Sequence, residues 1–220
     1  MPAKFHPSEE LLMDYASGAL REAASLAVAT HLALCPECRK AVHECEAIGG
    51  TLLEHTESMA VSSACRDKVM ALLDAQEKPA EPKKPEFDPF FCNVLPAPLR
   101  GYMGCGVSNV PWKKVSSTVE TARLDACKCS SGTARLIRVK AGARLPRHTH
   151  TGCEYTLVLM GSYRDGANLY RRGDFVVCDS EVDHAPAASE GEDCVCLIVL
   201  EGNMKLSGFM GRLLNPFVRF

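Results

Sequence analysis

Three residues with metal-binding side chains are closely spaced near the start of the chain. His31 and Cys35 are four residues apart in a segment of helical character, so both side chains project from one face. Cys38 follows after Cys35-Pro-Glu, an interval that lets two thiolates reach one ion. This H-x3-C-x2-C unit supplies three ligands, whereas a tetrahedral zinc ion takes four. The thiolates favour zinc over magnesium or calcium.

The fourth ligand of this predicted zinc site has several candidates. His6 is the nearest one, placed before the first expected helix, where it could fold back onto the second. His43 and Cys45 compete with it. A redox-active CxxC would follow a strand in a βαβ unit, and the sequence pattern has no such unit. We therefore favour a structural zinc, whose binding would stabilise a helical domain with little core of its own.

A second group of metal-binding residues lies in the C-terminal half of the chain. His148 and His150 alternate on a predicted strand and therefore share a face, and Glu154 follows four residues later. The spacing of these residues within 142–161 fits the first sequence motif of the cupin family. With His184, they give three imidazoles and one carboxylate, a set that suits Zn, Fe, Mn or Ni in the mouth of a barrel.

The second cupin motif is present with departures. Residues 173–184 keep its spacing and its histidine, His184. Asp179 stands where proline is usual, Glu181 stands where glycine is usual, and Ala188 replaces the closing asparagine. These changes weaken the turn assignment, but the fourth ligand remains.

Cys194 and Cys196 alternate on a predicted late strand and face the same side. They are close enough to share a ligand or an oxidant. A redox-sensing pair and two small core residues on an inner sheet face are equally open interpretations.

Four helices are expected before the middle of the chain. Ser8 is a plausible N-cap of the first helix. Pro36 can begin the third, because the first turn does not need its missing N–H, and Gly49-Gly50 are expected to interrupt or end it. The fourth starts near Ser62 or Ser63 and carries an apolar stripe.

The segment from Pro79 to Pro98 contains six of the thirteen prolines, so we expect a semi-rigid extended linker. Short apolar and β-branched runs follow it, separated by glycine, aspartate and asparagine, as in an antiparallel sandwich or barrel. These runs are residues 134–140, 155–160, 174–178 and 194–200. We predict two domains, an all-α zinc-binding bundle (residues 1–77) and an all-β cupin or jelly-roll barrel (99–220), joined by a linker (78–98).

The composition is that of an ordinary globular protein, with 46% apolar residues, 24% charged residues and a net charge of -2. Such a balance argues against nucleic acid or membrane as direct partners. No apolar run reaches the ~20 residues that span a bilayer, and the first residues do not resemble a signal peptide. We therefore expect a cytoplasmic protein, whose twelve cysteines serve as metal ligands, reactive thiols or core residues.

The sequence His31-Leu-Ala-Leu-Cys35-Pro-Glu-Cys38 is similar to the signature of zinc-binding anti-sigma domains, and residues 8–39 look like the ChrR branch of that family. The order of the two motifs, joined by a proline-rich linker, extends the resemblance to nearly the whole chain. The resemblance implies that these three residues and His6 bind one zinc. It also implies that the helical bundle grips a sigma factor, and it favours zinc in the cupin.

We therefore expect an anti-sigma factor, not an enzyme, and we name no catalytic residue. Its N-terminal domain would sequester an extracytoplasmic-function sigma factor. The resemblance implies that the cupin releases this factor on sensing singlet oxygen or an organic hydroperoxide. ChrR-like cupins carry a C-x-C like that of Cys194 and Cys196. The alternatives are a dioxygenase-like cupin metalloenzyme with an accessory zinc module and a metal or redox store. A homodimer through the cupin is a further candidate.

Overall fold

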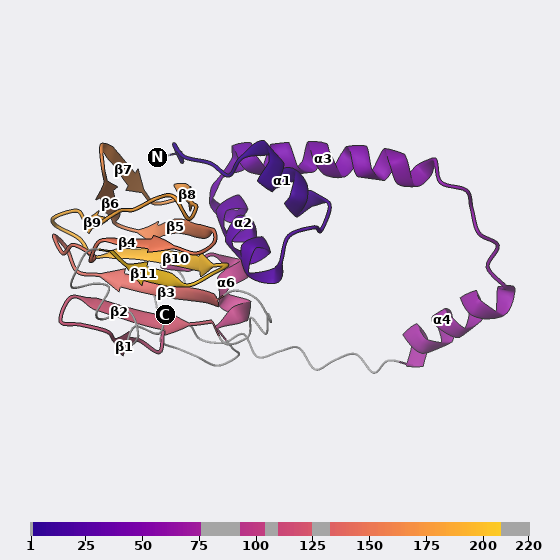
Figure 1. Ribbon diagram of the computed structural model, residues 1–220. Coiled ribbons are helices and arrows are strands. Elements are labelled where there is room, and N and C mark those ends of the chain that lie inside the picture. Colours follow the sequence, from indigo (N-terminus) through magenta and orange to yellow (C-terminus); the bar gives the residue numbers. More distant parts are fainter. Residues whose placement is uncertain (1, 76–92, 104–109, 125–132, 208–220) are drawn as a thin grey trace.

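The computed structural model describes residues 2–75, 93–103, 110–124 and 133–207 (Figure 1). Helices come first and antiparallel strands follow, which confirms the predicted order of an all-α and an all-β part. The helices are α1 (Glu9–Ala16), α2 (Glu22–Leu34), α3 (Pro36–Glu54), α4 (Ser63–Ala75) and a short α6 (Ala97–Tyr102). Among the described residues, no helix is both long enough and apolar enough to cross a lipid bilayer.

The helix boundaries agree with the sequence signals except at one point. The Ser8 hydroxyl accepts a hydrogen bond from the Leu11 amide at 3.2 Å and caps α1, and Pro36 occupies the first turn of α3. The prediction that Gly49-Gly50 interrupt or end α3 is wrong, because the helix continues to Glu54. A glycine costs a helix only about 1 kcal/mol relative to alanine, and neither of these two adopts a positive φ.

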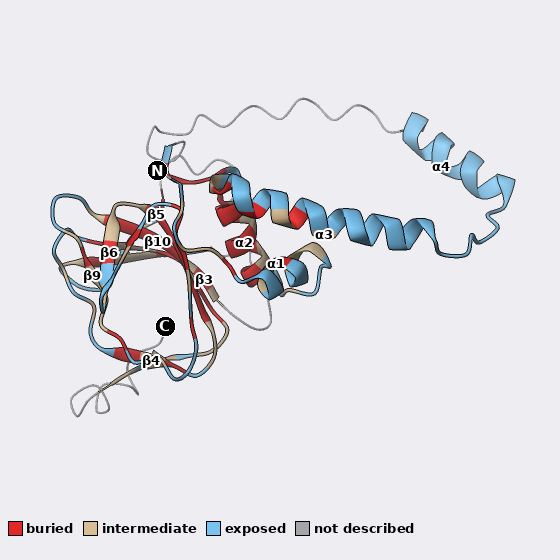
Figure 2. Ribbon diagram, turned by 90° about the horizontal axis from the view of Figure 1, so that it is seen from above, coloured by how far each residue is buried: buried red, intermediate tan, exposed pale blue. Residues whose placement is uncertain are grey.

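The strands form a barrel-like arrangement of three sheets, seen end-on in Figure 2. The largest sheet has the order β1-β2-β3-β10-β5-β8, the second has the order β7-β6-β9, and β11 pairs with β4. The strands in chain order are β1 (Lys113–Lys114), β2 (Val119–Arg123), β3 (Thr133–Val139), β4 (His148–His150), β5 (Glu154–Met160), β6 (Ser162–Asp165), β7 (Asn168–Arg171), β8 (Phe175–Cys178), β9 (Ala187–Ala188), β10 (Cys194–Leu200) and β11 (Met204–Leu206).

Helix α2 joins the helical part to the barrel. It packs against β5, β10 and α6. Its side chains are buried around most of its circumference, as expected of a helix that is apolar on every face. Leu26 and Val28 of α2 belong to the same buried cluster as Leu157 of β5 and Leu197 of β10. The helical part and the barrel therefore share one hydrophobic core.

The predicted linker ends in packed structure. Residues 76–92, which hold most of it, lie outside the described residues. Val94 and Leu95 are buried, and α6 begins at Ala97 with Pro98 in its first turn. The expectation of an extended segment up to residue 98 therefore fails at its C-terminal end, because proline is compatible with the first turn of a helix.

Candidate metal centres

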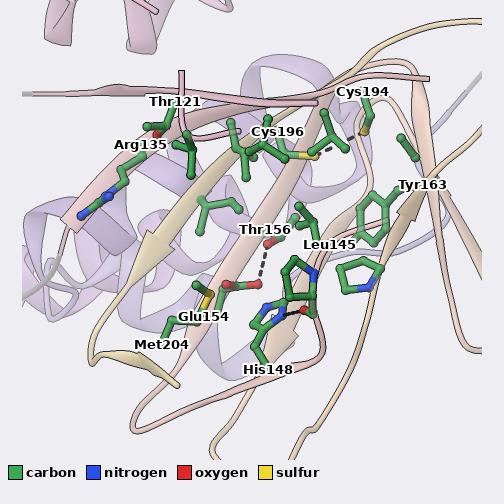
Figure 3. A pocket seen from close by; sticks show the side chains of 18 of the residues that line it. Thr121, Arg135, Leu145, His148, Glu154, Thr156, Tyr163, Cys194, Cys196 and Met204 are labelled. Atoms are coloured by element: carbon green, nitrogen blue, oxygen red, sulfur yellow. Dashed lines mark hydrogen bonds between the residues drawn. The ribbon is translucent and has the colours of Figure 1, made fainter. Parts of the chain in front are cut away.

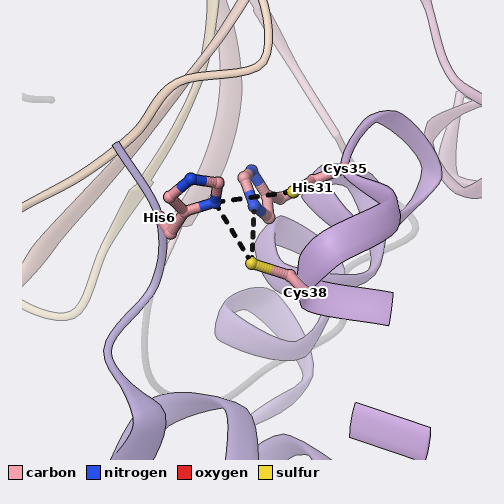
Figure 4. Close-up of side chains that lie close together, drawn as sticks. All are labelled: His6, His31, Cys35 and Cys38. Carbon is pink, nitrogen blue, oxygen red and sulfur yellow. Dashed lines mark hydrogen bonds between the residues drawn. The ribbon is translucent and has the colours of Figure 1, made fainter. Parts of the chain in front are cut away.

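The four residues of the N-terminal cluster converge from three places in the chain (Figure 4). His6 lies before α1, His31 lies in the last turn of α2, and Cys35 and Cys38 flank the start of α3. The Cys38 sulfur lies 3.3 Å from His31 Nε2 and 3.3 Å from His6 Nδ1, and the Cys35 sulfur lies 3.4 Å from His6 Nδ1. All four ligand atoms lie within 4.8 Å of one another.

These separations fit a tetrahedral zinc ion. Zinc–sulfur and zinc–nitrogen bonds of ~2.3 and ~2.0 Å place the ligand atoms about 3.6 Å apart. The structure thus brings His6 to the three residues of the H-x3-C-x2-C unit. It leaves the competing candidates outside the cluster: the side chain of His43 is 84% exposed and lies beside Glu46, and Cys45 is half-buried.

Hydrogen bonding and burial set the protonation states of two of these side chains. His31 Nδ1 lies 2.8 Å from the Gly173 carbonyl oxygen, a contact that assigns the proton to Nδ1 and leaves Nε2 to face the thiols. Burial lowers the pKa of His31 to about 4, so the imidazole is neutral. Burial also raises the pKa of Cys38 to about 12, and a bound cation would be needed to stabilise its thiolate.

The β7–β8 turn of the barrel positions the N-terminal strap, residues 4–6, which carries His6. Asp174 Oδ1 accepts hydrogen bonds from the Lys4 amide at 2.6 Å and the Phe5 amide at 3.1 Å. The Phe175 amide donates to the Phe5 carbonyl at 2.9 Å. Since Gly173 also contacts His31, two of the four clustered residues are positioned by one barrel turn.

The second cluster lies beside the last residue of β8, whereas the turn that contacts the N-terminal cluster precedes this strand. His148 and His150 come from β4, Glu154 begins β5, and His184 forms a bridge with His148. His184 Nε2 lies 3.1 Å from His148 Nε2 and 3.3 Å from His150 Nε2. Glu154 Oε2 lies 3.6 Å from His150 Nε2. The structure therefore brings together all four residues proposed from the cupin motifs.

Neighbouring groups orient two of these imidazoles. His148 Nδ1 donates to the Pro146 carbonyl at 2.7 Å, and His184 Nδ1 lies 2.6 Å from Asp165 Oδ2. Both contacts leave Nε2 directed at the cluster, the usual arrangement around histidine ligands of a metal. Burial lowers the pKa of His148 and raises that of Glu154. The donor set of three imidazoles and one carboxyl group suits a divalent transition metal.

The second cupin motif still forms a turn although it lacks the usual proline. Asp179, which stands in place of proline, accepts a hydrogen bond from the Glu181 amide at 2.9 Å through its side chain. This is an Asx turn, which fixes the backbone locally as a proline would. His184 consequently reaches the cluster despite the departures.

Cys178 is a residue of this cluster that sequence reasoning missed. Its sulfur lies within 4.8 Å of ligand atoms of Glu154 and His184. It is the partner of Glu154 in the β5–β8 register. Cys178 falls inside the second cupin motif but at none of its defining positions, so only knowledge of that register could have identified it.

Cys194 and Cys196 lie on β10 as predicted, with their sulfur atoms 3.7 Å apart. Both line a partly open cavity of about 270 Å³ in the barrel, together with His148, Glu154 and His184 (Figure 3). The hydrogen bond from Cys194 and burial raise the pKa of Cys196 well above its usual value. The pair thus faces the cavity, and burial favours the protonated thiol at Cys196.

Comparison with known proteins identifies relatives for both parts of the chain. Residues 101–204 match the family described as the ChrR cupin-like domain, and residues 8–39 match a putative zinc-finger family. The anti-sigma-E factor ChrR of Cereibacter sphaeroides is 39% identical over 220 residues, which is 100% of both chains.

Two solved structures resemble the chain to different degrees. The crystal structure of Rhodobacter sphaeroides SigE in complex with the anti-sigma ChrR matches with a TM-score of 0.76 and 39% identity. That match covers 90% of this chain and 99% of the other. An RmlC-like cupin protein from Ralstonia eutropha matches 50% of this chain and 74% of its own, with 23% identity and a TM-score of 0.43.

Proposed function

Because the chain belongs to the ChrR family of anti-sigma factors, we propose that it binds an extracytoplasmic-function sigma factor through its N-terminal helices. Binding would withhold the sigma factor from RNA polymerase. The solved ChrR relative is a complex with SigE, and this supports the same kind of partner here. We propose residues 1–77 as the sigma-binding domain and residues 99–220 as the cupin domain of a cytoplasmic protein.

Exposed apolar side chains on the helices are the observation that carries this proposal. Helix α4 buries none of its thirteen residues in the described structure, and the outer part of α3 is also exposed (Figure 2). The large apolar side chains exposed by half or more along this surface are Ile48, Leu52, Leu53, Met59, Val61, Val69, Met70, Leu72 and Leu73. An isolated helix of this length is marginal in water. An apolar surface of this kind typically marks a protein interface.

The N-terminal cluster would hold one zinc ion and set the direction of these helices. Cys35 and Cys38 lie at the corner between α2 and α3, and His6 ties the strap to the same point. A zinc ion bound to all four residues would therefore fix where α3 projects from the barrel. The match to a putative zinc-finger family over residues 8–39 supports this metal.

The cupin would act as the sensor that releases the sigma factor during oxidative stress, with singlet oxygen or an organic hydroperoxide as the signal. His148, His150, Glu154 and His184 would hold zinc or another divalent metal such as iron or manganese. Cys194 and Cys196 would be the oxidisable pair beside it. Release requires that the signal changes the relative populations of bound and released arrangements. An enzymatic role has less support, because the full-length relative is a regulator.

Affinity purification of the tagged chain from its native host, combined with metal analysis, tests the proposal. We expect one co-purifying sigma factor and at least one zinc per chain. Glu154→Ala should remove the cupin metal, keep the sigma factor bound in unstressed cells and abolish its release after oxidant treatment. The Cys194→Ser, Cys196→Ser double variant tests the thiols separately. Normal induction in both variants would refute the sensor, and the absence of any sigma factor would refute sequestration.

A further inference from the structure

Cys178, the last residue of β8, points into the barrel. Side chains alternate along a strand, so Cys178 and Val176 share one face of β8 and Phe175 lies on the other. Phe175 belongs to the core that the barrel shares with α2, whereas Val176 packs against the buried cluster inside the barrel that contains Cys196. Cys178 is itself buried. Its thiol therefore lies on the same side of the sheet as the imidazole cluster.

The thiol of Cys178 lies at metal-binding distance from two residues of the cupin cluster. The ligand atoms of Glu154, Cys178 and His184 all lie within 4.8 Å of one another. Bonds of ~2.0 to ~2.3 Å allow two ligand atoms of one ion to lie up to about 4.5 Å apart, so these three groups need only small movements to share an ion. The strand register supports this approach, because Cys178 is the direct partner of Glu154 on the neighbouring strand.

Two candidate metal positions therefore overlap in the barrel. One is formed by the imidazoles of His148, His150 and His184 together with the Glu154 carboxylate. The other is formed by Glu154, Cys178 and His184. The two positions share Glu154 and His184, and they differ in the remaining donors, which are two imidazoles in one position and a thiol in the other.

The two shared side chains are oriented by neighbours that belong to neither position. The Thr156 hydroxyl donates to Glu154 Oε1 at 3.0 Å (Figure 3). His184 Nδ1 lies 2.6 Å from Asp165 Oδ2, which leaves Nε2 for a metal. The choice between the positions then depends on the ion and on the remaining donors. Thiolate sulfur favours zinc, whereas imidazole and carboxylate also accept iron(II) and manganese(II).

We propose that Cys178 is a ligand of the cupin metal when this metal is zinc, which is then held by Glu154, Cys178 and His184. Iron(II) or manganese(II) is held instead by the three imidazoles and Glu154. Binding of zinc breaks the S–H bond of Cys178, forms a Zn–S bond and gives the proton to water, without transfer of an electron. Three protein ligands leave the fourth position of a tetrahedral zinc ion to water. The inference rests on the proposed cupin metal, but it does not depend on a sigma factor or on the signal.

Cobalt(II), which replaces zinc and absorbs in the near ultraviolet when it is bound to thiolate, tests the inference in the full-length chain. With both candidate centres loaded, we expect Cys178→Ser to lose about one third of this absorption, because three Co–S bonds become two. The cobalt content should not fall, since the three imidazoles and Glu154 still hold an ion. Cys153→Ser is the matched control. Cys153 precedes Glu154 but packs against the shared core, so the absorption of this variant should equal that of the unmodified chain.

Competition between ions gives a second readout. Cys178→Ser should weaken zinc binding in the cupin at least tenfold and leave manganese(II) binding unchanged, whereas Cys153→Ser should change neither. Equilibrium dialysis of the chain, with its N-terminal cluster already filled with zinc, measures both affinities.

X-ray absorption at the zinc edge of the unmodified chain needs no variant and remains decisive if Cys178→Ser fails to fold. We expect about 1.5 sulfur neighbours per zinc when both centres hold zinc, against about 1 if Cys35 and Cys38 supply all the sulfur. A value near the lower figure, or an unchanged cobalt spectrum in Cys178→Ser, would overturn this proposal and leave the cupin metal itself in place. A chain that binds no metal in the barrel would overturn both.

Discussion

Cys38 has a central place among the residues of the N-terminal cluster, since its sulfur contacts both histidines at 3.3 Å. We predict that Cys38→Ser loses about one zinc per chain and the ability to hold a sigma factor, because the metal-free corner between α2 and α3 frays. Metal analysis and co-purification measure both effects. Cys45→Ser is the matched control, as Cys45 lies outside the cluster. Full zinc content and full inhibition in Cys38→Ser would show that Cys38 is not a ligand.

At this scale, the sequence predicted the four residues proposed for each cluster, but neither Cys178 nor the groups that surround the clusters. The intervals among His31, Cys35 and Cys38 are short, so a helix and a turn bring them together without further information. Cys178 and Gly173 approach the clusters through strand pairing and packing between distant segments. Such contacts depend on register and on tertiary packing, neither of which a local motif encodes.

Among the elements, the β7–β8 turn is expected to hold the N-terminal strap in place. The Asp174 carboxylate in this turn accepts amide hydrogen bonds from Lys4, Phe5 and Arg171. Asp174→Asn places an amide group against one of these N–H donors and releases the N-terminal strap. We expect zinc affinity to fall by about 10- to 100-fold, as for other groups that orient metal ligands, with cupin metal content unchanged. Competition with a chromogenic chelator measures the zinc affinity.

Asp193→Asn is the control for this change, because Asp193 accepts an amide hydrogen bond from Ala141 and not from the strap. Its zinc affinity should equal that of the unmodified chain. An equal loss in both variants, or no loss in Asp174→Asn, would contradict the proposed role of the turn.

Helix α4 gives a second prediction at the element scale. Leu72 and Leu73 are 66% and 58% exposed, so the double change to aspartate should leave the melting temperature unaltered. The same change should weaken sigma binding at least 30-fold, about 2 kcal/mol in total, because it would bury two charged side chains where the interface takes apolar ones. Asp74→Ala on the same helix is the control. Unchanged affinity in the leucine variant would place the interface elsewhere.

The elements were predicted to different degrees for identifiable reasons. The apolar run at 194–200 coincides with β10, since the central strand of a sheet is buried on both faces. The continuation of α3 through Gly49-Gly50 was not predicted, because propensity is only a weak preference. The contact of α2 with the barrel could not be read from its composition, which indicates burial but not the partner.

For the molecule as a whole, the shared core bears on whether the helical part functions alone. We predict that a fragment of residues 1–75 still represses a sigma-dependent promoter, because it contains α1 to α4 and all four clustered residues. It should hold zinc more weakly than the full chain, since it lacks Gly173 and Asp174. Reporter repression and zinc competition measure the two properties. A folded, zinc-loaded fragment that cannot repress would move part of the interface into the cupin.

Strand β8 has a consequence for the relation between the two candidate metal centres. Gly173 and Asp174 precede it and contact the helical cluster, while Cys178 ends it beside Glu154 and His184. Five residues of extended chain span only about 16 Å. Thermodynamic reciprocity then applies: if occupancy of the cupin changes zinc affinity by some factor, zinc must change cupin affinity by the same factor. The occupancy of the N-terminal cluster by zinc would then change the affinity of the cupin site for what it binds.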